Sequence, residues 1–142
     1  MAEKILLVDD EKDFVEALAE RMRARGMEVA TATSAPDALA RSDQESFDAI
    51  VLDLQMPEMD GLEALKRFKE KNPELQVILL TGRATVEKGV QAMKLGALDL
   101  LEKPADIETL SRKIKDASAR KMVLVNKAAE EKIHDIMISK GW

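Results

Sequence analysis

Residues 5–10 read Ile-Leu-Leu-Val-Asp-Asp, an apolar run that ends in two carboxylates. Such a run is typical of a strand buried on both faces of a parallel sheet. The same pattern, an apolar run ending in polar groups, recurs at Leu52-Asp53, Leu80-Thr81 and Leu101-Glu102-Lys103-Pro104. In open α/β sheets, ligands bind outside the carboxyl ends of the strands. The four polar ends therefore predict one shared site.

The rest of the chain alternates strand patterns with helix patterns. We expect strands at Ile5–Val8, Val29–Ala32, Ala49–Leu52, Val77–Leu80 and Leu98–Leu101. Between them, apolar residues three or four positions apart predict helices at 12–25, 35–42, 62–71 and 86–95. Two pairs have the spacing of a helix-starting capping box: Ser34 with Asp37, and Asp60 with Glu63. Repeated strand–helix units predict a parallel sheet with helices on both faces.

The composition narrows the class of protein. The 142 residues suffice for one domain with a full core, and 46% hydrophobic with 35% charged residues is typical of a globular chain. The absence of cysteine excludes disulfides and thiolate metal sites. No apolar run reaches membrane-span length, and the start lacks the apolar region of a signal peptide. A net charge of −5 argues against nonspecific nucleic-acid binding. We therefore expect a cytoplasmic protein without a membrane or a direct nucleic-acid partner.

The polar strand ends suit a metal ion and a phosphoryl group. Asp9 and Asp10 repel each other, and a third carboxylate beside them needs a neutralising cation. Magnesium, a hard cation that prefers oxygen ligands, fits such a set. Asp53 can act as a nucleophile that accepts a phosphoryl group. Thr81 can donate its hydroxyl to a phosphoryl oxygen, and Lys103 can balance the charge as a compact cation.

Each of these residues also has an ordinary structural explanation. Asp9 and Asp10 can form a solvated acidic helix start, where negative charge complements the helix dipole. Asp53 can be a plain loop residue, Thr81 a strand end and Lys103 a solvated lysine. For each residue alone, the ordinary explanation is the stronger. Only their joint placement at strand ends favours a site.

These motifs resemble the receiver domain of bacterial two-component response regulators. The resemblance covers about residues 3–120. It rests on Ile5-Leu-Leu-Val-Asp-Asp, Asp53-Leu-Gln-Met-Pro-Glu-Met-Asp-Gly-Leu-Glu, Leu80-Thr-Gly and Gly96-Ala-Leu-Asp-Leu-Leu-Glu-Lys-Pro. It implies a flavodoxin-like, doubly wound sheet of five parallel strands with five flanking helices.

The resemblance also implies the roles of the site residues. Asp53 accepts a phosphoryl group from the phosphohistidine of a histidine kinase or histidine phosphotransfer protein. Asp10 and Asp53 ligate Mg²⁺ directly, Asp9 acts through water, and the backbone carbonyl of Gln55 completes the protein ligands. Thr81 and Lys103 contact the phosphoryl oxygens. Side chains at Gln55 and Arg83 tune the hydrolysis of the aspartyl phosphate.

Two features fall outside the family pattern. The family usually has an aromatic residue three positions before the lysine, whereas this chain has Leu100 there and no tyrosine at all. After the expected closing helix, apolar residues continue at helical spacing but on a shifted face of the helix. This shift suggests a bend, a break or a change of packing partner near Arg120. We therefore expect a receiver domain at 1–120 and a helical extension at 121–142, without a separate output domain.

The hypothesis is a phosphorylation-dependent signalling switch that acts through protein–protein contact. Its downstream target is not identified by the sequence, and a homodimer is a candidate assembly. It is not an enzyme in the usual sense, because it catalyses only its own phosphorylation and dephosphorylation. One alternative is a dimerising or scaffold module that does not depend on phosphorylation. Another is a phosphatase of the haloacid dehalogenase type, although Asp53-Leu54-Gln55 lacks the second carboxylate that such enzymes need.

Overall fold

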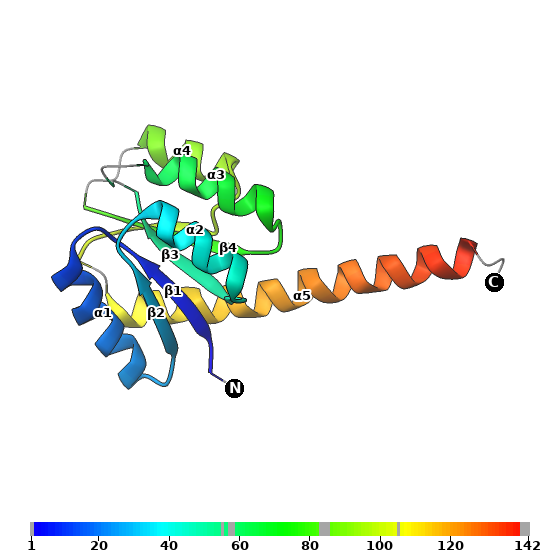
Figure 1. The fold of residues 1–142 in the computed structure, drawn as a ribbon, viewed down its shortest axis with the longest axis horizontal. Helices are drawn as coiled ribbons and strands as arrows, with labels where there is room; N and C mark the ends of the chain where they lie inside the picture. The colour runs from blue at the N-terminus through cyan, green and yellow to red at the C-terminus, as the bar shows by residue number, and fades with distance from the viewer. Residues whose placement is uncertain (1, 55, 57–58, 83–85, 105, 140–142) are drawn as a thin grey trace.

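The computed structural model describes residues 2–54, 56, 59–82, 86–104 and 106–139 as alternating strands and helices (Figure 1). The strands are β1 (Lys4–Val8), β2 (Glu28–Ala32), β3 (Ala49–Asp53), β4 (Gln76–Thr81) and β5 (Asp99–Glu102). The helices are α1 (Lys12–Ala24), α2 (Ala35–Gln44), α3 (Gly61–Lys71), α4 (Val86–Lys94) and α5 (Ile107–Ser139). Every predicted strand and helix is present, with ends displaced by a few residues at most.

The five strands form one parallel sheet in the order β2-β1-β3-β4-β5. This strand order is that of the flavodoxin-like doubly wound fold, which confirms the predicted fold class. The order places β1 and β3 side by side, with Val8 in register with Leu52. The residues that follow these two positions therefore leave the sheet at the same edge.

Two apolar cores lie on the two faces of the sheet. One face carries α1 and α5, which pack on β-strand residues such as Leu7, Val51 and Ile78. The opposite face carries α2 and α3, with Ala92 of α4, and buries the alternate strand residues such as Leu6 and Ile50. The central strands are buried on both sides, which explains their nearly unbroken apolar sequences.

The start of α3 lies very close to the end of β3. Asp60 caps α3, because its carboxylate accepts hydrogen bonds from the backbone of Leu62 at 2.8 Å and Glu63 at 3.0 Å. Gly61 follows directly, and its amide donates to the Leu54 carbonyl at 2.7 Å. A β-carbon on Gly61 would lie only 2.5 Å from Leu54 Cα and 2.7 Å from the carbonyl oxygen of Asp53. Glycine is therefore needed to hold the end of β3 against α3.

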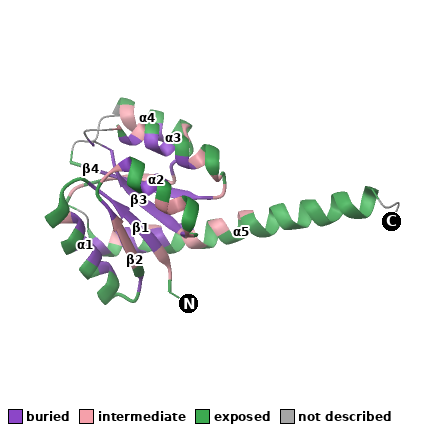
Figure 2. Cartoon of the chain, in the orientation of Figure 1, coloured by how far each residue is buried: buried purple, intermediate pink, exposed green. Residues whose placement is uncertain are grey.

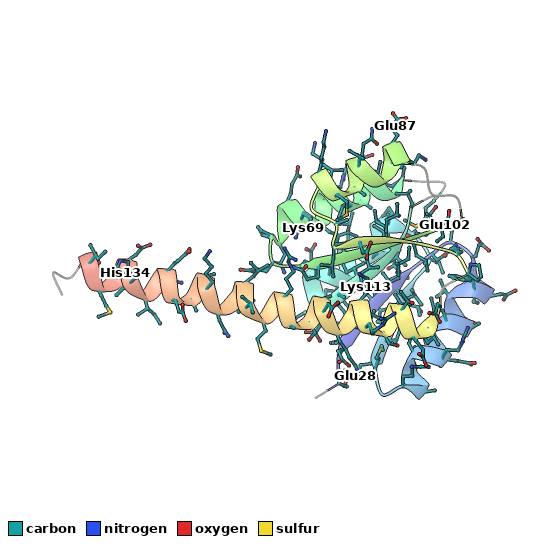
Figure 3. The ribbon with its side chains drawn as sticks, turned by 180° about the vertical axis from the view of Figure 1, so that it is seen from behind. Glu28, Lys69, Glu87, Glu102, Lys113 and His134 are labelled. Atoms are coloured by element: carbon teal, nitrogen blue, oxygen red, sulfur yellow. The ribbon has the colours of Figure 1, made fainter. Side chains whose placement is uncertain are left out.

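The last helix runs far past the sheet. In α5, the buried residues end at Ala117, and the Lys121 ammonium donates to the Phe47 carbonyl at 2.6 Å. Beyond residue 124 the helix is exposed along its length and projects from the body (Figure 2). His134 lies on this projecting part (Figure 3). The helix is continuous from Ile107 to Ser139, so the shift of the apolar face marks the loss of a packing partner within one helix.

None of the helices in the described part of the chain combines the length and apolarity that a membrane-spanning helix requires. This holds for α5 as well, because charged residues recur along its length.

We expect Gly61→Ala to lower the free energy of unfolding by about 2–4 kcal/mol, because the added methyl group overlaps the backbone of residues 53 and 54. Urea denaturation measures the change. Gly82→Ala is the matched control, since a β-carbon there meets nothing within 4 Å, and its effect should stay within about 1 kcal/mol. Equal losses in the two variants would contradict the close approach at Gly61.

Removing residues 122–142 should change the free energy of unfolding by only about 0.5 kcal/mol, because the deleted part is largely exposed while Lys121 remains in place. Thermal and urea denaturation of the full and shortened chains measure the difference. A loss of several kcal/mol in the shortened chain would mean that residues 122–142 stabilise the rest of the protein.

Candidate functional site

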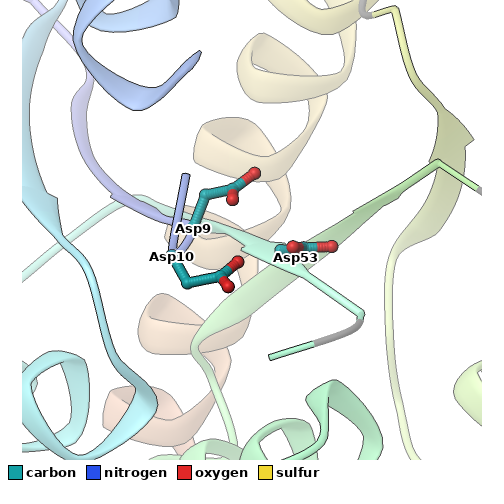
Figure 4. A group of neighbouring side chains, drawn as sticks. All are labelled: Asp9, Asp10 and Asp53. Atoms are coloured by element: carbon teal, nitrogen blue, oxygen red, sulfur yellow. The ribbon is translucent and has the colours of Figure 1, made fainter. Parts of the chain in front are cut away.

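Three carboxylates converge at the carboxyl ends of β1 and β3. Asp9 and Asp10 follow β1, and Asp53 ends β3 (Figure 4). Each offers a carboxylate oxygen, and the three oxygens lie within 4.8 Å of one another. Asp9 and Asp53 are buried, whereas Asp10 is exposed. The predicted convergence of these residues is therefore present.

Local backbone contacts hold Asp9 in place. Its amide donates to the Ala32 carbonyl at 3.2 Å, which continues the pairing of β1 with β2. Its Oδ1 atom accepts a hydrogen bond from the Glu11 amide at 2.9 Å, just before α1 begins. The side chain is thus oriented by the turn that joins β1 to α1. On β3, the Leu54 amide donates to the Leu80 carbonyl at 3.1 Å and fixes the position of the chain directly after Asp53.

Lys103 supplies the positive charge of the cluster. Its Nζ atom lies 2.7 Å from Asp9 Oδ2, 3.7 Å from Asp53 Oδ2 and 3.5 Å from Glu11 Oε1. Burial by itself would lower the pKa of Lys103. The close ion pair with Asp9 and the negative charges of Asp53 and Glu11 outweigh burial and raise the pKa of Lys103 above its ordinary value. The ammonium therefore stays charged and bridges the ends of β1 and β3.

Thr81 lies at the end of the neighbouring strand. It is fully buried as the last residue of β4, and its carbonyl accepts a hydrogen bond from the Lys103 amide at 2.7 Å. This backbone contact ties the end of β4 to the residue that carries the ammonium. The peptide bond between Lys103 and Pro104 is cis.

The sequence prediction covers most, but not all, of this neighbourhood. Gln55 and Arg83 lie outside the described residues. Glu11 and Phe14 were not predicted, yet both contact the Lys103 ammonium. Their spacing of three residues at a helix start was the only available signal, since residues so spaced share a helix face. Nothing in the sequence pairs that face with Lys103.

The carboxylate cluster fits a hard divalent cation. In the part of the chain that the structure describes, the ammonium of Lys103 opposes these three carboxylates, and one positive charge does not balance three negative ones. Oxygen ligands gathered within a few ångströms suit Mg²⁺, which is held by one or two carboxylates together with water and phosphate oxygens. The exposure of Asp10 leaves the cluster open to such partners.

Comparison with known proteins identifies the family. The family model for the response regulator receiver domain matches residues 5–115. The chain belongs to this family, whose members act in two-component signalling. Receiver domains are signalling switches, normally not conventional enzymes, and they interact with histidine kinases.

Among curated relatives, the transcriptional regulatory protein ZraR of Salmonella typhimurium is 40% identical over 115 residues, or 81% of this chain. The C4-dicarboxylate transport transcriptional regulatory protein DctD of Pseudomonas aeruginosa is 33% identical over 145 aligned residues, or 97% of this chain. The chain spans 26% of the length of the first and 31% of the second.

Solved structures agree on the fold. A response regulator receiver domain protein from Clostridium thermocellum has a TM-score of 0.81 and 34% identity; the match covers 87% of this chain and 99% of that one. The beryllofluoride-activated NtrC4 receiver domain dimer has a TM-score of 0.78 and 34% identity, with 83% and 98% covered. Dimers therefore occur among structurally similar receiver domains.

We expect Mg²⁺ to raise the stability of the protein, because the ion offsets repulsion among carboxylates that are separated when the chain unfolds. At a concentration one hundred times its dissociation constant, the gain should be about 2.7 kcal/mol. Thermal denaturation with and without Mg²⁺ measures it. The gain should vanish in Asp10→Asn and persist in Asp135→Asn, which alters an exposed carboxylate on the projecting part of α5. An equal gain in all three proteins would contradict a site at the carboxylate cluster.

Proposed function

We propose that this protein is a phosphorylation-dependent switch in which Asp53 accepts a phosphoryl group from a histidine kinase or a histidine phosphotransfer protein. One observation carries the proposal. The Asp53 carboxylate is buried at a strand end, gathered with Asp9 and Asp10 and 3.7 Å from the Lys103 ammonium. A cytoplasmic location belongs to the proposal, because these partners present their phosphohistidine there.

The proposed transfer is a direct displacement at phosphorus. A carboxylate oxygen of Asp53 forms a bond to phosphorus while the bond to the donor histidine nitrogen breaks, and the electron pair of that bond stays on the nitrogen. Such transfers depend on positioning and charge neutralisation more than on covalent chemistry by the protein. The rigid strand ends supply the positioning.

In this proposal the metal ligands are Asp10 and Asp53 directly, Asp9 through water, and the carbonyl of Gln55, which lies outside the described residues. Bound Mg²⁺ supplies charge neutralisation for the phosphoryl oxygens. Burial of Asp9 and Asp53 strengthens these electrostatic contacts, because a less polar surrounding screens charge poorly.

Thr81 and Lys103 are proposed to hold the phosphoryl oxygens on Asp53. Thr81 ends β4, the strand next to β3 in the sheet, and Lys103 directly follows β5, the strand beyond β4. A new contact at Thr81 changes the balance between two conformations only if the contact differs between them. Leu100 on β5 is half-buried against the core at the position where the family usually has an aromatic residue. The proposed switch therefore uses an aliphatic side chain at this position.

The proposed output is contact with a downstream protein through α4, β5, α5 and the helical extension. Val90 and Met93 on α4 are about half exposed, at 48% and 52%, and with Leu100 they line a shallow apolar depression. A second copy of the chain is a candidate partner for the same surface. The division into a receiver domain at 1–120 and an extension at 121–142 remains part of this proposal.

Incubation with acetyl phosphate and Mg²⁺ should add the mass of one phosphoryl group, because small phosphoryl donors reach an open carboxylate cluster. Intact mass spectrometry measures the gain. The gain should be lost in Asp53→Asn and retained in Asp135→Asn. Absence of the gain in the unaltered protein would favour a module independent of phosphorylation, and steady turnover of small phosphoesters that Asp53→Asn leaves unaffected would contradict the proposed function.

A further inference from the structure

The ring of Phe14 lies beneath the ammonium of Lys103. The Nζ atom is 4.4 Å from the ring centroid, well within the range of a cation–π contact. The Lys103 side chain is only 14% exposed, so water competes weakly for this ammonium. Such a contact is stronger when the cation is desolvated.

Helix α1 presents Phe14 and Glu11 together. Glu11 is the N-cap residue of α1, and Phe14 follows three positions later, so both side chains reach Lys103 from the same face. Phe14 is half-buried and packs on the core between α1, α5 and the sheet. The ring is therefore held in place by packing, while Glu11 is 68% exposed and free to be solvated.

Two other close partners of Lys103, the carboxylates of Asp9 and Asp53, are groups that the proposed function also engages, whereas Glu11 is mostly exposed. A divalent cation at Asp9 and Asp53 would reduce their attraction for the ammonium and repel it directly. The π-face of Phe14 ligates no metal and accepts no phosphoryl group. It therefore continues to attract the ammonium when the carboxylates are occupied.

We propose that Phe14 is a positioning residue that keeps the Lys103 ammonium at the site when metal and phosphoryl group occupy the carboxylates. The proposal rests on the function assigned to Asp53 above. Without the ring, the flexible Lys103 side chain is less ordered before the phosphoryl group arrives. Its contact with the phosphoryl oxygens must then offset a larger loss of side-chain entropy. The aromatic face, rather than apolar bulk, is the property that matters.

Beryllofluoride in saturating Mg²⁺ is the probe, because it mimics a phosphoryl group, and ¹⁹F NMR titration measures its affinity. Phe14→Leu should weaken binding by between about 3-fold and 30-fold, the range of a cation–π contact. Phe14→Tyr retains the π-face and should restore most of the affinity. Phe47→Leu removes a buried ring near Lys4 instead; it should lower stability without weakening binding.

Two further measurements separate positioning from packing. In a Lys103→Met background, Phe14→Leu should have no additional effect on beryllofluoride affinity, because the two residues act as a pair. In the unaltered, metal-free protein, the ε-protons of Lys103 should show an upfield ring-current shift that is absent in Phe14→Leu and present in Phe14→Tyr.

The outcomes distinguish this inference from the proposed function. If the unaltered protein does not bind beryllofluoride, the proposed function fails and the role of Phe14 fails with it. If it binds but Phe14→Leu binds equally well, or if Phe14→Tyr fails to restore binding, the phosphoryl site stands and the positioning role of Phe14 is wrong.

Discussion

The mutual repulsion of Asp9, Asp10 and Asp53 is the constraint on which the rest of this structure depends. Three carboxylates whose oxygens approach within 4.8 Å need a compensating positive charge. Lys103 supplies part of it, reaching Asp9 at 2.7 Å and Asp53 at 3.7 Å. We propose that the remaining negative charge attracts a cation and that a phosphoryl group then joins the cluster. A bound cation would thus reduce the repulsion among the three carboxylates.

The fold imposes this arrangement through the sheet. Because β1 and β3 are parallel neighbours, their carboxyl ends meet at one edge, and the cores on both faces prevent the strands from separating. Gly61 fixes the chain that follows Asp53 by admitting the backbone of Leu54 at a distance that no side chain allows. The burial of apolar side chains on both faces therefore holds the strands together against the repulsion among the three carboxylates at the edge of the sheet.

Much of this follows from the sequence, because apolar runs and their polar ends carry the required information. The spacing of the apolar residues predicts the strand positions and the doubly wound fold. The polar residues at the strand ends predict the convergence of Asp9, Asp10 and Asp53. The contact of Phe14 with Lys103 is not predictable in this way, since it joins two residues distant in sequence, one near the start of α1 and one directly after β5. The same holds for Lys121, whose hydrogen bond to Phe47 sets where α5 leaves the body. The shift of the apolar face near Arg120 leaves open whether the helix bends, breaks or loses a packing partner. The structure shows one continuous helix whose buried residues end at Ala117.

If Asp53 accepts a phosphoryl group as proposed, the cation and the phosphoryl group share one site at the ends of β1, β3 and β4. The most direct measurement is a crystal structure with Mn²⁺ and beryllofluoride, using the anomalous scattering of manganese to locate the metal. We expect one manganese peak among Asp9, Asp10 and Asp53, with beryllium on Asp53 and fluorines contacting Thr81 and Lys103. Manganese elsewhere, or beryllofluoride absent from Asp53, would contradict the proposal.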